Sequence, residues 1–184
     1  MADHSSLIRE LYAAGIVETG EFTLKSGAIS PVYIDLRRLV GYPALLARVA
    51  EIYAEAADSF EFDVLAALPY AAMPIGTALS LRMDRPMVYP RKERKGYGTD
   101  KLVEGVYREQ DTALVIDDVV TDGGAKLEGI QALEAAGLVV RDVLVLVDRE
   151  AGGREALDAA GYRLHALLTL DEILNLEEVS PPGS

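Results

Sequence analysis

The chain has 184 residues, of which 50% are apolar and 26% charged, and this length suits one well-cored domain better than two. Its net charge of −12 argues against general nucleic-acid binding, which needs a basic footprint. The absence of cysteine excludes disulfides, cysteine-bound zinc, iron–sulfur clusters and thiol nucleophiles.

The first 40 residues mix helix, strand and turn signals. Residues 7–14 predict an amphipathic helix, and the stretch that follows alternates strand and turn patterns. We interpret residues 1–40 as a small hood over a sheet. We expect one domain over residues 1–179, with a disordered tail at 180–184.

From about residue 62 onward, short apolar runs alternate with helical segments. The predicted strands are 62–68, 86–89, 113–117, 143–147 and 165–170. The predicted helices are 71–82, 126–136 capped by Gly137, 154–160 and a short acidic one from Asp171, with a long loop at 91–106. Apolar strands separated by helices predict an α/β fold, with a central, mostly parallel sheet flanked by helices.

Residues 114–125 (LVIDDVVTDGGA) carry the strongest functional signal. A buried strand ends in Asp117 and Asp118, and a glycine-rich turn then leads into a helix. Ligands of open α/β sheets lie beyond the carboxyl ends of the strands, and a helix N-terminus favours phosphate. Thr121 adds a hydroxyl donor, and the two carboxylates can accept sugar hydroxyls directly or through Mg²⁺ and water. No Gly-Lys-Ser/Thr follows, so this is not a Walker A loop, and the helix pattern disfavours a hairpin turn.

The same segment resembles the phosphoribosyl pyrophosphate (PRPP) motif of type I phosphoribosyltransferases. The resemblance implies that Asp117 and Asp118 serve the ribose hydroxyls and catalysis. It makes Mg²⁺ the cofactor, held through the substrate and water, with the same two carboxylates as candidate ligands. The remaining PRPP-binding residues of the motif would be Val119, Val120, Thr121, Asp122, Gly123, Gly124 and Ala125. Asp122 and Ala125 depart from the common pattern.

Two further blocks resemble the orotate-specific branch of that family. In residues 22–37 (FTLKSGAISPVYIDLR), Lys25, Tyr33 and Ile34 would line an orotate pocket, where an anionic flat ring needs a cation at its edge and an apolar face. In residues 147–153 (VDREAGG), Arg149 would bind orotate together with Thr121. Taken alone, Tyr33 also fits a core strand position, and Arg149 a surface turn.

The basic loop 89–105 (YPRKERKGYGTDKLVEG) resembles the catalytic loop of the same branch. By resemblance, Arg91, Lys92 and Lys95 bind pyrophosphate, Lys95 is catalytic, and Tyr97 stands where many relatives have His. The family's loop reaches the partner subunit's site, which implies a homodimer. The plain alternative is a solvated charged loop.

A second loop, residues 68–74 (LPYAAMP), resembles the family's pyrophosphate-side loop. Tyr70 and Ala71 would contact PRPP there. Many relatives have Lys at the position of Ala71, so one cationic ligand is absent.

The resemblance implies transfer of the phosphoribosyl group from PRPP to orotate, which yields orotidine 5′-monophosphate and pyrophosphate in pyrimidine (UMP) biosynthesis. Two alternatives stay open: a phosphoribosyltransferase for another base, and a catalytically weak sensor of PRPP. No basic-then-apolar leader and no bilayer-length apolar run occur, so we expect a cytoplasmic protein with no membrane partner. We also expect no decarboxylase domain.

Overall fold

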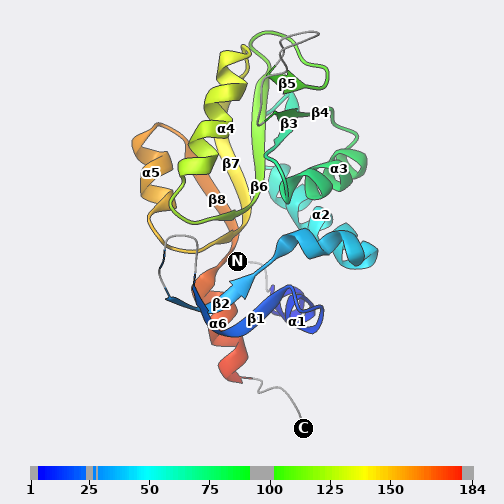
Figure 1. Cartoon of the computed structure of the whole chain (residues 1–184). Coiled ribbons are helices and arrows are strands. Elements are labelled where there is room, and N and C mark those ends of the chain that lie inside the picture. Colours follow the sequence, from blue (N-terminus) through cyan, green and yellow to red (C-terminus); the bar gives the residue numbers. More distant parts are fainter. Residues whose placement is uncertain (1–3, 24–26, 28, 92–101, 180–184) are drawn as a thin grey trace.

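The computed structural model describes residues 4–23, 27, 29–91 and 102–179, with side chains described up to residue 176. Its centre is a six-stranded sheet of order β5-β4-β3-β6-β7-β8, seen nearly edge-on in Figure 1. The strands are β3 (Val64–Ala67), β4 (Met87–Pro90), β5 (Val103–Glu104), β6 (Thr112–Val120), β7 (Val139–Asp148) and β8 (Arg163–Thr169). Only β4 and β5 pair antiparallel, so the mostly parallel sheet is confirmed.

Helices cover both faces of this sheet, with α2 (Pro43–Ala57) and α3 (Ala72–Met83) on one side and α4 (Gly124–Ala135) and α5 (Gly153–Ala159) on the other (Figure 1). Strand β6 shows why residues 113–116 are apolar throughout. Leu114 and Ile116 belong to the core cluster that includes α2 and α3, whereas Ala113 and Val115 belong to the cluster beneath α4 and α5. A strand buried on both faces has no polar side to show in its sequence.

The N-terminal hood is confirmed as a separate small layer next to the sheet (Figure 1). It consists of helix α1 (Ser5–Ala13), the antiparallel pair β1 (Val17–Thr23) and β2 (Ile29–Ile34), and the 3-10 helix η1 (Leu36–Gly41). The C-terminal helix α6 (Leu170–Val179) joins it, because the Tyr12 hydroxyl of α1 donates to the Ile173 carbonyl of α6 at 3.3 Å. The hood therefore combines both ends of the chain.

The structure corrects several sequence-based element assignments. We did not predict helix α2, although Leu45, Val49 and Tyr53 follow each other at four-residue spacing and are buried. The strand predicted at 113–117 continues through the Asp pair to Val120, since β7 pairs with it as far as Asp148. The predicted loop 91–106 contains the short strand β5. The predicted tail 180–184 lies outside the described residues.

No helix within the described ranges combines the length and the apolar character needed to cross a bilayer.

Gly137 follows α4 with φ of +92°, the left-handed conformation that the predicted helix cap requires.

Candidate active site

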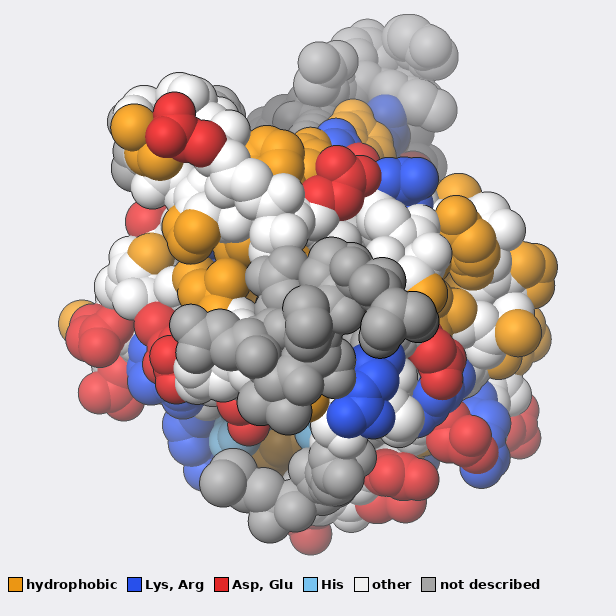
Figure 2. All heavy atoms as spheres, turned by 90° about the horizontal axis from the view of Figure 1, so that it is seen from below, with side chains coloured by type: hydrophobic (Ala, Val, Ile, Leu, Met, Phe, Trp, Pro, Cys, Tyr) orange, Lys and Arg blue, Asp and Glu red, His pale blue; other side chains and the backbone are white. Residues whose placement is uncertain are grey.

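The sequence-predicted site residues gather at the carboxyl edge of the parallel strands. Tyr70 follows β3, Thr121 follows β6, and Arg149 follows β7. The strand order reverses between β3 and β6, because β4 continues the sheet to one side and β7 and β8 to the other. Such a reversal point is where open α/β sheets bind ligands, in the crevice beyond the strand ends. The hood lies on this side, and Figure 2 shows that face with acidic and basic side chains interspersed around its rim.

The β6–α4 loop has the geometry of an anion-binding turn. Gly123 is left-handed, with φ of +82°, and precedes the first residue of α4. Its carbonyl accepts the Lys126 and Leu127 N–H groups at 3.0 Å, which starts the helix. The Asp122 carboxylate turns back and accepts the Gly124 N–H at 3.0 Å. An anion that binds this N–H must therefore displace the Asp122 side chain.

The two carboxylates of the motif differ in their surroundings. Asp117 is 5% exposed, and its two oxygens accept the Asp118 N–H at 2.9 Å and the Lys126 ammonium at 2.8 Å. Burial raises the pKa of the Asp117 carboxyl to about 7, with Lys126 opposing the shift and Asp118 adding to it. Asp118 is half-buried. The Tyr53 hydroxyl donates to the Asp117 carbonyl at 2.6 Å and ties this strand end to α2.

Lys126 was absent from the predicted site. It is the only basic residue of the predicted helix 126–136, and its pairing with Asp117 had no sequence signal beyond its position just after the glycine-rich turn.

The Asp pair suits Mg²⁺ only in combination with a substrate. Across the residues that the structure describes, no three His, Asp or Glu side chains gather to hold a metal ion. Mg²⁺ commonly keeps several waters and takes one or two carboxylates together with substrate phosphates. The adjacent Asp117 and Asp118 carboxylates fit this mode and do not form a metal cage of their own.

Arg149 connects the sheet edge to the hood. Its guanidinium donates to the Ser30 hydroxyl of β2 at 2.8 Å, and its backbone N–H donates to the Val120 carbonyl at 3.0 Å. Ser30 is buried and was not among the predicted site residues. Burial lowers the pKa of the Arg149 guanidinium, which marks a partly desolvated cation. Arg149 is therefore more than a surface arginine in a turn.

The loop that carries Arg149 is held in place by the buried carboxylate that precedes it. The Asp148 carboxylate, 2% exposed, accepts the Glu150 N–H at 2.9 Å and the Arg154 guanidinium at 3.0 Å. This pairing satisfies a buried charge and fixes the turn after β7.

The other predicted hood residues lie on β2. Tyr33 is 37% exposed, contradicting the alternative of a purely core residue, and its ring centroid lies 5.5 Å from that of Phe22. Its hydroxyl accepts the Arg37 guanidinium at 3.2 Å. Ile34 is partly buried against the core. Lys25 lies outside the described residues.

The predicted pyrophosphate side is described only in part. Tyr70 is exposed and Ala71 buried, and the peptide bond between Pro69 and Tyr70 is cis. Arg91 follows β4, donates its backbone N–H to the Leu102 carbonyl at 2.8 Å, and places its guanidinium 3.5 Å from Glu104. Lys92, Lys95 and Tyr97 lie outside the described residues.

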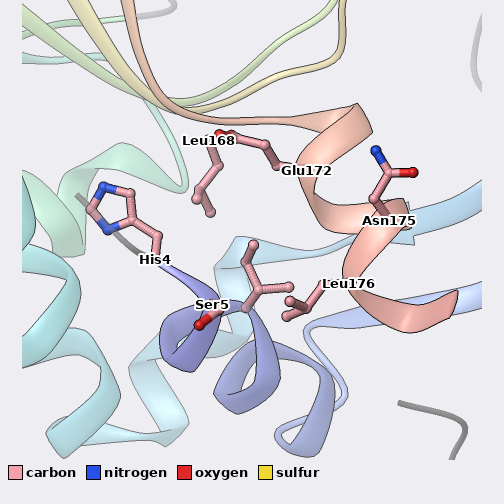
Figure 3. A pocket seen from close by; sticks show the side chains of 7 residues that line it. His4, Ser5, Leu168, Glu172, Asn175 and Leu176 are labelled. Carbon is pink, nitrogen blue, oxygen red and sulfur yellow. The ribbon is translucent and has the colours of Figure 1, made fainter. Parts of the chain in front are cut away.

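A cavity of about 330 Å³ between α1, β8 and α6 is separate from these residues (Figure 3). It is lined by His4, Ser5, Ile8, Leu168, Glu172, Asn175 and Leu176. None of these residues was assigned to the site from the sequence.

Comparison with protein-family models gave no match. The chain is 42% identical over 127 residues to orotate phosphoribosyltransferase of Methanothermobacter thermautotrophicus, covering 69% of each protein. It is 41% identical over 170 residues to the bifunctional enzyme PyrF/PyrE of Nostoc sp., covering 92% of this chain and 36% of that one. The crystal structure of orotate phosphoribosyltransferase from Aeropyrum pernix superposes with a TM-score of 0.83 at 35% identity, covering 96% of this chain and 99% of that one.

The fold, with its glycine-rich loop after β6 and its hood, defines a type I phosphoribosyltransferase. The chain belongs to the orotate phosphoribosyltransferase family. It spans 26% to 58% of the length of several curated relatives that it matches, among them a bifunctional enzyme and two uridine 5′-monophosphate synthases.

Gly153 offers a direct test of the β6–α4 loop. A Cβ atom added at this position would lie 2.7 Å from the Thr121 carbonyl oxygen, so Gly153→Ala must push the loop backbone away. We expect a loss of about 1–3 kcal/mol in the free energy of unfolding, as overpacking usually causes. Thermal denaturation measures this loss.

Gly41→Ala is the matched control, because a Cβ at Gly41 meets no atom within 4 Å. A Gly153→Ala variant with the stability of the control would contradict close packing of α5 on this loop.

Proposed function

We propose that the chain transfers the 5-phosphoribosyl group from PRPP to orotate, giving orotidine 5′-monophosphate and pyrophosphate in UMP biosynthesis. The observation that carries this proposal is the hydrogen bond between Arg149 and Ser30. It joins Ser30 of β2 to the loop after β7, and the Arg149 N–H donates to the Val120 carbonyl at the end of β6. Family membership supports the same activity.

In this proposal, the two substrates occupy adjacent parts of the sheet edge. The N–H groups of residues 121–125 and the N-terminus of α4 hold the 5′-phosphate, after the Asp122 carboxylate leaves the Gly124 N–H. Asp117 and Asp118 accept the ribose hydroxyls. Arg149, Thr121, Lys25, Tyr33 and Ile34 surround orotate, with the guanidinium as the partner of its carboxylate.

The reaction needs no protein nucleophile. The bond between the anomeric carbon and the pyrophosphate oxygen breaks, and a bond to the orotate ring nitrogen forms with inversion. That nitrogen loses its proton, which the departing pyrophosphate or water accepts. Positive charge develops on the ribose and negative charge on the leaving group, so positioning and electrostatics supply most of the rate. Arg91, Lys92 and Lys95 act on the pyrophosphate side. Mg²⁺, when bound with PRPP, neutralises part of the pyrophosphate charge.

Three finer points belong to the same proposal. The first is a homodimer in which the 91–105 loop reaches the partner subunit's site, and it rests on the family resemblance. The others are a single domain over residues 1–179 and a cytoplasmic location, which rest on the length and the apolar patterning of the sequence.

The test is orotate consumption, followed by loss of its ultraviolet absorbance. We expect orotate consumption only when PRPP and Mg²⁺ are both present. We expect no consumption of PRPP when uracil, adenine or hypoxanthine replaces orotate as acceptor. Omission of either addition is the control. PRPP binding without orotate consumption would instead favour another acceptor base, or a PRPP sensor.

A further inference from the structure

Lys126 is a largely buried cation near a helix N-terminus, a place that is electrostatically unfavourable for positive charge. Its side chain is 11% exposed, and it belongs to the first turn of α4. The N-terminus of a helix carries partial positive charge, which repels a cation there. An ammonium group withdrawn from water also costs free energy unless a charged partner compensates it. Lys126 therefore needs a nearby anion, and the Asp117 carboxylate at 2.8 Å is that anion.

The Asp117 carboxylate also requires a nearby cation, and Lys126 supplies it. The Asp117 side chain is 8% exposed, and the neighbouring Asp118 adds a second negative charge to the same strand end. Without a cation, the two carboxylates would repel each other in a poorly solvated place. The ammonium of Lys126 offsets this repulsion and holds one oxygen of Asp117, while the Asp118 N–H holds the other.

The pair leaves Asp117 able to accept further hydrogen bonds. A carboxylate has about four acceptor positions on its two oxygens. The two interactions described occupy one position on each oxygen, so a ligand hydroxyl can still use the remaining ones. The orientation of the carboxylate is thus set before any ligand arrives, which lowers the entropic cost of binding.

We propose that Lys126 is a positioning residue of the phosphoribosyl site, which holds the Asp117 carboxylate in the orientation that accepts a ribose hydroxyl of PRPP. This inference rests on the proposed function for its ligand. Lys126 acts through Asp117 and does not itself contact the substrate.

The first test is Lys126→Met, which removes the charge and keeps a side chain of similar length. We expect the Kd of PRPP, measured calorimetrically with Mg²⁺, to rise about 10-fold, the loss typical of one hydrogen bond to a charged group. The KM for orotate at saturating PRPP should change less than about twofold, because the pair lies on the ribose side. Gln131→Met, at an exposed position of the same helix, is the matched control.

The second test separates positioning from simple stabilisation. Asp117→Asn combined with Lys126→Met removes both buried charges, so the melting temperature should return toward that of the unmodified chain. The Kd of PRPP should stay about 10-fold above that of the unmodified chain, since the amide introduced by Asp117→Asn lacks the negative charge of the carboxylate acceptor. Recovery of both the melting temperature and the PRPP Kd would overturn the proposal, as would an unchanged Kd in Lys126→Met.

The binding measurement also separates this inference from the proposed function. An unmodified chain that binds PRPP but does not consume orotate contradicts the proposed function alone, and the Lys126 effect on PRPP binding would still be expected. A chain that does not bind PRPP contradicts both.

Discussion

Replacement of Lys95 by alanine is expected to lower turnover about 10²–10³-fold, the range found when one preorganised charge-stabilising donor is removed. The proposed reaction places new negative charge on the pyrophosphate oxygens as the bond to the anomeric carbon breaks. An ammonium next to these oxygens stabilises the transition state more than the ground state, so its loss affects kcat. The Kd of PRPP should change only a few-fold, because Arg91 and Lys92 are also proposed to bind the pyrophosphate. Single-turnover kinetics and PRPP calorimetry measure the two quantities separately.

Lys101→Ala is the matched control for Lys95→Ala. It removes the same charge from the same loop at a position without an assigned role. Unchanged turnover in Lys95→Ala would remove this residue from the mechanism, and equal losses in both variants would point to the overall charge of the loop.

Replacement of Arg149 by alanine is expected to raise the KM for orotate about 10- to 150-fold, equivalent to the 1.5–3 kcal/mol of a hydrogen bond to a charged group. The guanidinium is partly desolvated and already oriented by Ser30, so it can bind a planar carboxylate with little further loss of freedom. The KM for PRPP should change little. Steady-state kinetics with each substrate varied in turn give both constants.

Arg141→Ala serves as the control for Arg149→Ala. Arg141 is exposed and lies near the start of β7, whereas Arg149 follows the end of this strand. A selective rise in the KM for PRPP, with orotate unaffected, would count against the assignment of Arg149 to orotate. The KM for orotate of Arg149→Lys should lie between the values for the unmodified chain and for Arg149→Ala, since lysine keeps the charge but loses the paired donors.

Much of the architecture followed from local patterns in the sequence. The apolar runs that became β3, β6 and β7 lacked a polar side, and that pattern alone indicated a parallel sheet covered on both faces. Helix α2 was not predicted, although its apolar spacing is regular and Pro43 lies in its first turn. The sequence therefore contained the signal for this helix. The end of β6 was misplaced for a physical reason: carboxylates suggested the strand end, whereas pairing with β7 extends it to Val120.

The sequence by itself determined the alternation of strands and helices from about residue 62 onward, the Asp-Asp and glycine-rich turn after a buried strand, and the family blocks around Lys25, Lys95 and Arg149. These depend on periodicity, turn chemistry and motif spacing, which are local properties of a chain. Only the tertiary structure decided which groups meet: Arg149 with Ser30, 119 residues away, Lys126 with Asp117, and α6 with the hood. Ion pairs and hydrogen bonds of this kind form because packed elements bring their side chains together and exclude water from them, and no local pattern encodes that juxtaposition.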